Sequence, residues 1–382
     1  MADPNDPAFG PEGRSTRRRF LRALGLGALA APALAALPGA AQTVPGGGLQ
    51  PMPRAPLAGA GGVRPPLIKP PRLRRGGTIG LVCPASALDG RDALDEARED
   101  LDRLGFATQP GRYCLERYGY LAGTDEQRAE DIMSMFADPD VDAILALRGG
   151  WGAPRILPLL DYDFIRAHPK PLIGYSDITA LLLAVYARSG IVTFHGPVGR
   201  STWNSETAEA FLRVLVYGER LVIDPLTGTN ADGERTGGGR RRMSPRTLFD
   251  GLAEGPLAGG NLTVMTALVG TPYMPDTRGH ILFFEDVNEP LYRVDRLLTQ
   301  LKQGDVLGPA AGIVFGQCSS CPDEAGMAVE DVLRDHLRPL RRPAWSGAPI
   351  GHVSPVYTLP LGVRAATDSA LGTLALLEPA VT

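Results

Sequence analysis

A serine at a predicted strand-to-helix turn is the residue of this sequence best placed for covalent chemistry. Ser176 lies in the run Gly174–Asp177, between an apolar stretch over residues 171–173 and an amphipathic stretch over residues 178–188. A sharp turn after a strand exposes the serine hydroxyl, and the first free N–H groups of the next helix can bind an oxyanion formed there. Serine and aspartate are also the usual residues at helix starts. The turn therefore predicts a nucleophile, a helix cap, or a residue that is both.

The elements around this turn alternate between strand and helix. Short apolar runs predict strands, and apolar residues recurring every three or four positions predict helices. The alternation is typical of an α/β fold in which helices cover both faces of a parallel sheet, giving three layers. Ligands bind such sheets beyond the carboxyl ends of the strands, where Gly149, Gly150 and Ser176 fall. The predicted strands cover residues 78–83, 143–147, 172–173 and 191–194, and the predicted helices cover residues 92–104 and 125–136.

A second α/β unit is predicted in the last third of the chain. Its apolar strand over residues 280–286 ends in the acids Glu285 and Asp286, and its last strand ends at Ile350–His352. A carboxylate at the end of an apolar strand is costly unless it is paired. A further strand is predicted over residues 312–316, and helices are predicted over residues 262–269, 290–301 and 329–337.

The N-terminus has the pattern of a targeting segment. Thr16–Arg22 resembles a twin-arginine export signal, and a Gly/Ala/Leu stretch follows over residues 23–37, with small residues at Gly39–Ala41. A membrane anchor is the competing interpretation, but a span needs about twenty strongly apolar residues, and this stretch is shorter and interrupted by Pro32. We therefore expect export by the twin-arginine route, to the periplasm or otherwise out of the cytoplasm, with no stable membrane span after processing.

Five segments are expected along the chain. Residues 42–72 are rich in proline and glycine, and such a composition cannot bury enough apolar surface to fold. The segments are a signal peptide over residues 1–41, a linker over 42–72, an N-terminal domain with the serine over 73–224, an interdomain linker over 225–246 and a smaller C-terminal domain over 247–382.

The charge balance and the cysteine spacing argue against a nucleic-acid-binding protein and against a metalloprotein. The 39 Lys and Arg nearly balance the 42 Asp and Glu, and no basic stripe alternates with aromatic residues, so no nucleic-acid partner is expected. Cys318 and Cys321 have the spacing of half a zinc site or of a redox pair, but no second pair has such a spacing, so no metal is expected. A local disulfide and two free thiols both remain open for this pair.

Several separate motifs follow one another between about Leu73 and the C-terminus: Arg148–Gly152, Ile173–Leu181, His195–Pro197, Glu285–Asp286, Tyr292–Arg296, Gly351–Val353 and Leu359–Gly362. In this order they resemble the LD-carboxypeptidase (muramoyltetrapeptide carboxypeptidase) family. The resemblance implies a serine peptidase with a Ser-His-Glu triad, an α/β N-terminal domain that carries the serine, and a C-terminal domain that carries the other two. It also implies a homodimer and no metal or organic cofactor.

The resemblance assigns a role to each matching residue. Ser176 is the nucleophile, His352 the general base, and Glu285 the carboxylate that orients the imidazole. The backbone N–H groups of Gly150 and Asp177 are the oxyanion donors. Arg148 is a further hypothesis, as a bidentate partner of the substrate's terminal carboxylate.

The chemistry of the side chains agrees with this assignment. A serine hydroxyl needs a base within hydrogen-bond reach, and a carboxylate on the second ring nitrogen stabilises the imidazolium that forms. Of the five histidines, His168 and His336 are expected at the surface and His280 in a structural role. His195, which follows an apolar strand, is the competitor of His352.

The expected reaction is hydrolysis of the amide bond between an L-centre and a C-terminal D-residue of a peptidoglycan-derived tetrapeptide. Ile178 stands where the lipase elbow has its second glycine, which argues against an ordinary α/β-hydrolase esterase. The sequence also leaves open a microcin-immunity type peptidase, for which Trp203 is the candidate base-stacking residue, and a non-catalytic wall-binding protein.

Overall fold

The computed structural model of the protein describes residues 65–224 and 245–382. The predicted signal peptide, most of the predicted linker over residues 42–72 and nearly all of the interdomain linker over residues 225–246 lie outside the described residues. Within the described part, no helix is long and apolar enough to cross a membrane.

The first sheet has the strand order β12-β5-β4-β3-β1-β2. Its strands β1 to β5 pair in parallel, as the α/β prediction requires, and β12 joins the edge antiparallel to β5. The strands are β1 (Thr78–Val82), β2 (Ala107–Pro110), β3 (Ala143–Ala146), β4 (Leu172–Gly174), β5 (Phe194–His195) and β12 (Leu359–Pro360). The helices of this half are α2 (Arg91–Arg103), α3 (Asp125–Ala137), α4 (Ala153–Ile156), α5 (Tyr162–Ala167), α6 (Thr179–Ser189) and α7 (Ser205–Leu215).

The second sheet has the order β6-β14-β13-β8-β9-β10-β11-β7, with β8, β9, β10 and β11 parallel and the other pairs antiparallel. The strands are β6 (Val222–Ile223), β7 (Arg246–Phe249), β8 (Leu252–Asn261), β9 (Ile281–Val287), β10 (Gly312–Ser319), β11 (Ala344–Ser346), β13 (Arg364–Asp368) and β14 (Thr373–Leu376). The helices are α8 (Leu262–Ala267), α9 (Leu291–Gln303) and α10 (Val329–Leu337), and short 3₁₀ turns cover Leu157–Leu159, Ser176–Ile178 and Arg338–Leu340.

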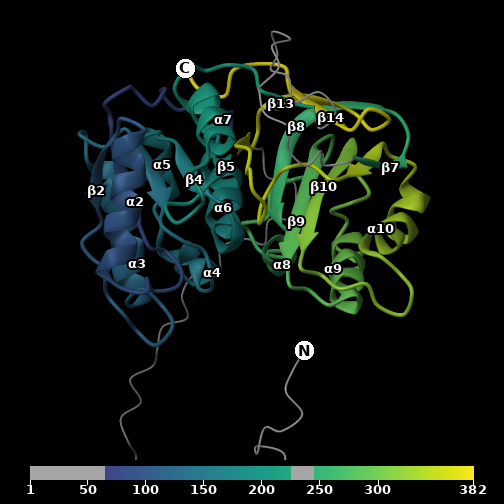
Figure 1. Cartoon of the computed structure of the whole chain (residues 1–382), viewed down its shortest axis with the longest axis horizontal. Coiled ribbons are helices and arrows are strands. Elements are labelled where there is room, and N and C mark those ends of the chain that lie inside the picture. The colour runs from purple at the N-terminus through teal and green to yellow at the C-terminus, as the bar shows by residue number, and fades with distance from the viewer. Residues whose placement is uncertain (1–64, 225–244) are drawn as a thin grey trace, which may run out of the picture. The chain divides into compact units, whose positions relative to one another are not determined.

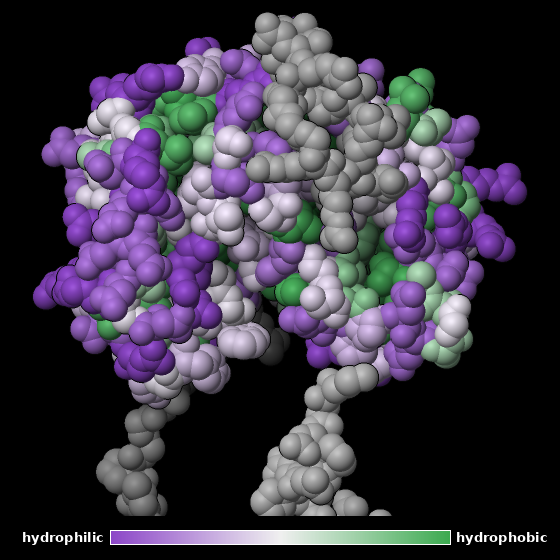
Figure 2. Space-filling view, in the orientation of Figure 1, coloured by the Kyte–Doolittle hydropathy of each residue, from purple (hydrophilic) through white to green (hydrophobic). Residues whose placement is uncertain are grey.

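Helix α6 lies between the two sheets (Figure 1) and packs against β4 and β5 of the first and β8 of the second. Its residues Thr179–Tyr186 are all buried. The helix predicted here is present, but its predicted amphipathic character was wrong, because a helix that contacts both sheets has no face left for solvent. Helices α2 and α3, by contrast, are hydrophilic on the side that Figure 2 shows.

Two predicted strands differ from the structure. The strand predicted over residues 191–194 is reduced to Phe194–His195, because Ile191 forms only an isolated bridge with Ile68. The last strand predicted to end at His352 was also wrong: β11 ends at Ser346, and Gly347, Pro349 and Gly351 keep residues 347–353 out of the ladder.

The boundaries of the predicted linker and domains differ from those of the folded structure. Ile68 N donates to Gly190 O at 2.9 Å, and Arg72 N donates to Thr382 O at 3.1 Å, so the folded part begins before Leu73. Strand β6 pairs with β14 of the second sheet, and β12 pairs with β5 of the first. Each sheet therefore contains a strand from the predicted domain that forms the other sheet.

Candidate active site

The turn after β4 holds Ser176 in a backbone conformation that few side chains adopt. Its φ is 64°, in the left-handed region that costs a non-glycine residue on the order of 1 kcal/mol. Neither Ser176 nor Asp177 caps α6; the Asp177 carboxylate instead accepts from Ala153 N, at the start of α4, at 2.7 Å. The helix-cap interpretation was therefore wrong, and the strained turn holds a half-exposed hydroxyl at the strand end.

The glycine pair after β3 lies directly against this turn. A Cβ on Gly149 would stand 2.7 Å from Ser176 Cβ and 3.2 Å from Asp177 N, and a Cβ on Gly150, whose φ is 108°, would collide with Ser86. Glycine at both positions thus lets the backbone approach the serine. Among the described residues, the amides of Gly150 and Asp177 donate to no acceptor, as an oxyanion site requires.

Glu285 and His352 form a short, buried pair. Glu285, near the end of β9, is fully buried, and its Oε2 lies 2.7 Å from His352 Nδ1 and 3.2 Å from His352 N. Gly351 has a φ of 79°, and a Cβ there would collide with the Glu285 carboxyl group. Only glycine at this position allows the loop to bring His352 onto the carboxylate.

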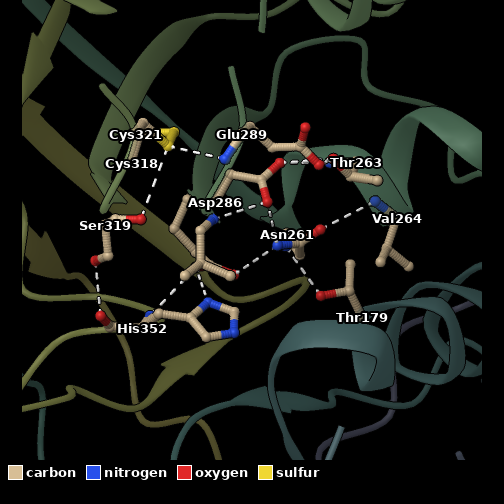
Figure 3. A network of polar contacts seen from close by, with 12 residues as sticks. Thr179, Asn261, Thr263, Val264, Asp286, Glu289, Cys318, Ser319, Cys321 and His352 are labelled. Carbon is tan, nitrogen blue, oxygen red and sulfur yellow. Dashed lines mark hydrogen bonds and ion pairs between the residues drawn. A yellow bond between two sulfur atoms is a disulfide. The ribbon is translucent and has the colours of Figure 1, made fainter. Parts of the chain in front are cut away.

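The carboxylate of Glu285 belongs to a larger polar network (Figure 3). Asn261 Nδ2 donates to Asp286 Oδ1 at 3.0 Å and lies 3.4 Å from Glu285 Oε1. Asp286 points away from His352, since its Oδ2 accepts from Thr263 N at 3.0 Å and from Thr263 Oγ1 at 2.8 Å. Sequence reasoning missed Asn261; its position at a strand end before a helix was the available signal.

Two contacts join the Ser176 turn to the Glu285–His352 pair. The Tyr175 ring lies edge-on to the His352 ring with centroids 4.9 Å apart, and Asn261 N donates to Thr179 Oγ1 at 3.0 Å. The turn therefore lies beside the Glu285–His352 pair. Ser176 Oγ itself has no hydrogen-bond partner among the described residues, so there is no bond between the hydroxyl and the imidazole.

The pKa of His352 is raised above its ordinary value. Burial of the ring opposes its charged form, but the hydrogen bond and charge of Glu285, with a smaller effect from Asp286, outweigh burial. Burial also raises the pKa of Asp177 to about 6, although the Ala153 amide favours its ionised form. The Glu285–His352 pair can thus accept a proton and hold it.

His195 packs against Tyr175 and differs from His352 in its burial, its hydrogen bonds and its pKa. It is fully buried, neither ring nitrogen has a hydrogen-bond partner among the described residues, and burial lowers its pKa to about 3. Its ring packs edge-on against Phe283 and Tyr175, at 5.3 and 6.2 Å between centroids. A ring with so low a pKa and no carboxylate partner is too weak a base to take the serine proton.

The other predicted residues lie as follows. Arg148 Nη1 donates to Ala87 O at 2.9 Å and lies 3.4 Å from Asp89 Oδ1. His336, expected to be exposed, lies 2.6 Å from Asp295 and is largely covered. Cys318 and Cys321 form a disulfide, and among the described residues no group of His, Cys, Asp and Glu could hold a metal ion.

An α/β fold with a strained serine at a strand end and a histidine–carboxylate pair beside it is the arrangement found in serine hydrolases. Residues 79–196 match the LD-carboxypeptidase N-terminal domain family and residues 254–367 match the LD-carboxypeptidase C-terminal domain family. The chain belongs to the LD-carboxypeptidase family and is a peptidase, which confirms the resemblance found in its motifs.

Known relatives extend over nearly the whole described chain. A probable murein peptide carboxypeptidase of Bacillus subtilis is 39% identical over 317 residues, covering 82% of this chain and 95% of that protein. The microcin C7 self-immunity protein MccF of Escherichia coli is 31% identical over 323 residues, covering 79% of this chain and 93% of that protein. The structure of MccF in complex with glutamyl sulfamoyl guanosine matches with a TM-score of 0.74 at 28% identity, covering 82% of this chain and 99% of that one.

The structure of muramoyltetrapeptide carboxypeptidase from Oxalobacter formigenes matches with a TM-score of 0.66 at 29% identity, covering 78% of this chain and 97% of that one. These matches confirm the two-domain α/β fold.

Proposed function

We propose that this protein is a serine LD-carboxypeptidase that releases the C-terminal D-alanine from peptidoglycan tetrapeptides. The observation that carries the proposal is the buried Glu285–His352 pair, with 2.7 Å between Oε2 and Nδ1, beside the strained Ser176 turn. The printed names of the relatives support the substrate class, since those from Bacillus subtilis and Oxalobacter formigenes are described as murein or muramoyltetrapeptide carboxypeptidases.

In the proposed acylation step, Ser176 Oγ attacks the carbonyl carbon of the L-residue, and its proton passes to His352 Nε2. The oxyanion accepts hydrogen bonds from the amides of Gly150 and Asp177. His352 then gives the proton to the departing amine of D-alanine. Glu285 keeps Nδ1 protonated throughout, so that Nε2 is the acceptor, and it stabilises the imidazolium between the two transfers.

Deacylation repeats this sequence with water as the nucleophile. His352 takes a proton from the water, which attacks the acyl carbon, and then returns the proton to Ser176 Oγ. The hydrogen bond between the hydroxyl and the imidazole forms when substrate is bound, as catalytic hydrogen bonds often tighten in the Michaelis complex. The residues of the site carry out the whole cycle without a cofactor.

Three further features belong to the proposal. Arg148 recognises the terminal carboxylate of the peptide. Without substrate, Asp89 pairs with both Arg148 and Arg200; when substrate binds, Arg148 turns to the peptide and Asp89 keeps its ion pair with Arg200. The twin-arginine signal carries the protein to the compartment of the cell wall. The enzyme is a homodimer, which sedimentation equilibrium would show as twice the chain mass.

Trp203 offers little to the microcin-immunity interpretation. Its ring packs edge-on against Phe211 with centroids 5.2 Å apart, and its Nε1 donates to Gly199 O at 3.2 Å. An indole held on both sides in this way is not free to stack on a nucleobase. The tetrapeptide therefore remains the better substrate.

The test is to incubate the purified protein with muropeptide tetrapeptide and to measure free D-alanine and the tripeptide product. We expect release by the wild type and none by Ser176→Ala. A wild type that cleaves a peptide–nucleotide conjugate but not the tetrapeptide would overturn the proposed substrate, and undiminished release by Ser176→Ala would overturn the nucleophile.

A further inference from the structure

The loop that carries His352 follows β11 and lies against β10. Gly347 N donates to Phe315 O at 2.9 Å, where the loop leaves β11 and crosses β10. A Cβ on Gly316 would lie 3.1 Å from Ile350 O, so the loop runs close above that strand. The position of the His352 imidazole therefore depends on the backbone of β10 and of the residues at its C-terminal end.

Ser319, the last residue of β10, makes a second contact with His352, separate from those of Glu285, at the backbone carbonyl (Figure 3). Its Oγ donates to His352 O at 2.7 Å, and its own carbonyl accepts from Asn288 N at 2.8 Å. Ser319 is also in register with Val287, two residues beyond Glu285. One residue thus links the backbone of His352 to the strand that carries its carboxylate.

The disulfide between Cys318 and Cys321 closes the turn on which Ser319 lies. Cys321 N donates to Cys318 O at 3.2 Å, and Glu289 N donates to Cys321 Sγ at 3.3 Å, so the closed turn is also fixed to the segment after β9. Ser320, inside the turn, has a φ of 58°, a conformation that an open chain would leave readily. The disulfide bond keeps Ser319 directed at the His352 carbonyl.

We propose that Ser319 is a positioning residue for His352 and that the Cys318–Cys321 disulfide maintains it, so that the enzyme works at full rate only with this disulfide closed. The inference rests on the proposed role of His352 as general base. Ser319 holds the carbonyl of His352, while Glu285 holds its ring and its backbone N–H, and losing the Ser319 contact allows the ring to leave the carboxylate. A dithiol opens the bond by giving two electrons and two protons: the S–S bond breaks, two thiols form, and the dithiol becomes a cyclic disulfide.

The test compares four variants and the wild type with and without a dithiol such as dithiothreitol. Ser319→Ala removes the hydroxyl, Ser319→Thr retains it, and Cys318→Ala/Cys321→Ala removes the disulfide. Ser320→Ala, at an exposed neighbour whose side chain makes no polar contact within the described residues, is the matched control. The readouts are kcat and KM for D-alanine release, and the pKa of the His352 ring from NMR titration of its Cε1–H signal.

We expect Ser319→Ala to lower kcat about five- to tenfold with little change in KM, the effect of one lost hydrogen bond, and Ser319→Thr to restore it. The dithiol lowers kcat of the wild type by a similar factor and has no effect on the double cysteine variant, which is slow from the start. In each slow form the pKa of His352 falls, because the Glu285 contact is less populated. Ser320→Ala behaves as the wild type does.

Unchanged kcat and an unchanged His352 pKa in Ser319→Ala would overturn the inference, as would a wild type whose rate and titration do not respond to the dithiol. The titration separates this failure from that of the proposed function. A protein that releases no D-alanine, but whose His352 pKa still falls in Ser319→Ala and on reduction, retains the positioning role and loses only the proposed reaction.

Discussion

The proton affinity of His352 follows from the groups that face its ring. Glu285 and Asp286 lie on β9 and raise its pKa, whereas the neutral rings of Tyr175 and His195 on the other side add no negative charge. The base form is required for attack, so activity falls as the pH drops through the pKa of His352. The acidic limb of kcat/KM is therefore expected above about 6.5, the ordinary value for histidine.

Glu285→Gln tests this origin of the pKa. Without the carboxylate charge, burial alone acts on His352, and the acidic limb moves to lower pH. The ring also loses its preferred tautomer, and kcat falls on the order of a hundredfold or more. The measurement is the pH profile of D-alanine release from about pH 4 to about pH 9, on either side of the ordinary histidine pKa. A limb at the wild-type position would mean that Glu285 does not set the pKa.

Asp177 makes a contribution to stability that is lost as the pH rises, whereas the contribution of a salt-bridged acid is lost as the pH falls. Its folded pKa of about 6 lies above the value of about 3.9 in an unfolded chain. The folded state holds the proton longer, so the free energy of unfolding decreases as the pH rises from about 4 to about 6.

Asp177→Asn should remove this decrease, which amounts to about 3 kcal/mol for a shift of this size. The Asn oxygen can still accept from Ala153 N. Urea unfolding at about pH 4 and about pH 7 would show a smaller fall in stability for the variant than for the wild type. Asp131, whose pKa burial also raises to about 6, contributes equally to both proteins. Parallel pH dependences would contradict the assignment to Asp177.

Ser176, Glu285 and His352 could be proposed from the sequence because motifs mark all three, and Ser176 and Glu285 also lie close to strand ends. Asn261 and Ser319 could not be, because each acts through a partner far away in the chain: Asn261 through Asp286 and Thr179, and Ser319 through the carbonyl of His352. A hydrogen bond to a backbone oxygen does not depend on which residue type supplies that oxygen, so the sequence does not indicate the partner. Such residues can be identified only from a structure that shows how the strands pair.

At the scale of elements, the loop after β11 shows how a glycine fixes a site. Gly351 and Gly326 have nearly equal φ angles, 79° and 80°, but a Cβ on Gly351 meets the Glu285 carboxyl group and a Cβ on Gly326 meets nothing within 4 Å. Both alanine variants carry the same conformational strain, about 1 kcal/mol. Only one of them displaces the carboxylate.

Gly351→Ala is therefore expected to lower kcat at least about a hundredfold, since the carboxylate and the imidazole must separate, while Gly326→Ala stays near the wild-type rate. Steady-state kinetics, with the free energy of unfolding from urea titration, separates the two effects. Equal kcat values for the two variants would show that the contact with Glu285 does not position His352.

The parallel pairing of β1, β3, β4 and β5 in the first sheet followed from the alternation of apolar runs, but the strand order and the ends of elements did not. Predicted strands at residues 191–194 and before His352 were too long, because apolar residues there pack in loops rather than in ladders. The prediction that helix α6 is amphipathic failed for a similar reason. The pattern of polar and apolar residues along the helix depends on the side chains alone, whereas its burial on the remaining face comes from packing against β8 of the second sheet.

At the scale of the whole described molecule, the site depends on strands and helices that the two halves share. Besides the exchanged strands β6 and β12, Asn204 Nδ2 donates to Ser354 Oγ at 2.8 Å, and Val356 N donates to Thr207 Oγ1 at 3.1 Å. The pairing of Leu359 with His195 continues this contact into the first sheet. Sequence patterns could not predict such an exchange, because the two strands concerned are only two residues long.

Thr179→Val tests the contact between the halves. The fully buried Thr179 hydroxyl accepts from Asn261 N, and its loss leaves that amide unsatisfied, at about 1–3 kcal/mol of stability. Asn261 then shifts from Glu285, and kcat falls severalfold. Thr193→Val is the matched control, since it removes a buried hydrogen bond to Leu182 O within the first half. Equal kcat losses in both variants would show that the Thr179 contact does not act through the site.

Labelling by a fluorophosphonate tests the central claim, that Ser176 is a nucleophile activated by His352, most directly. In this reaction the serine oxygen attacks phosphorus, fluoride leaves, and the serine proton passes to the base. Mass spectrometry of the intact and digested protein should show one adduct, on the peptide containing Ser176, with labelling abolished in Ser176→Ala and strongly slowed in His352→Ala. A protein that releases D-alanine while its adduct forms on another residue, or not at all, would contradict the account.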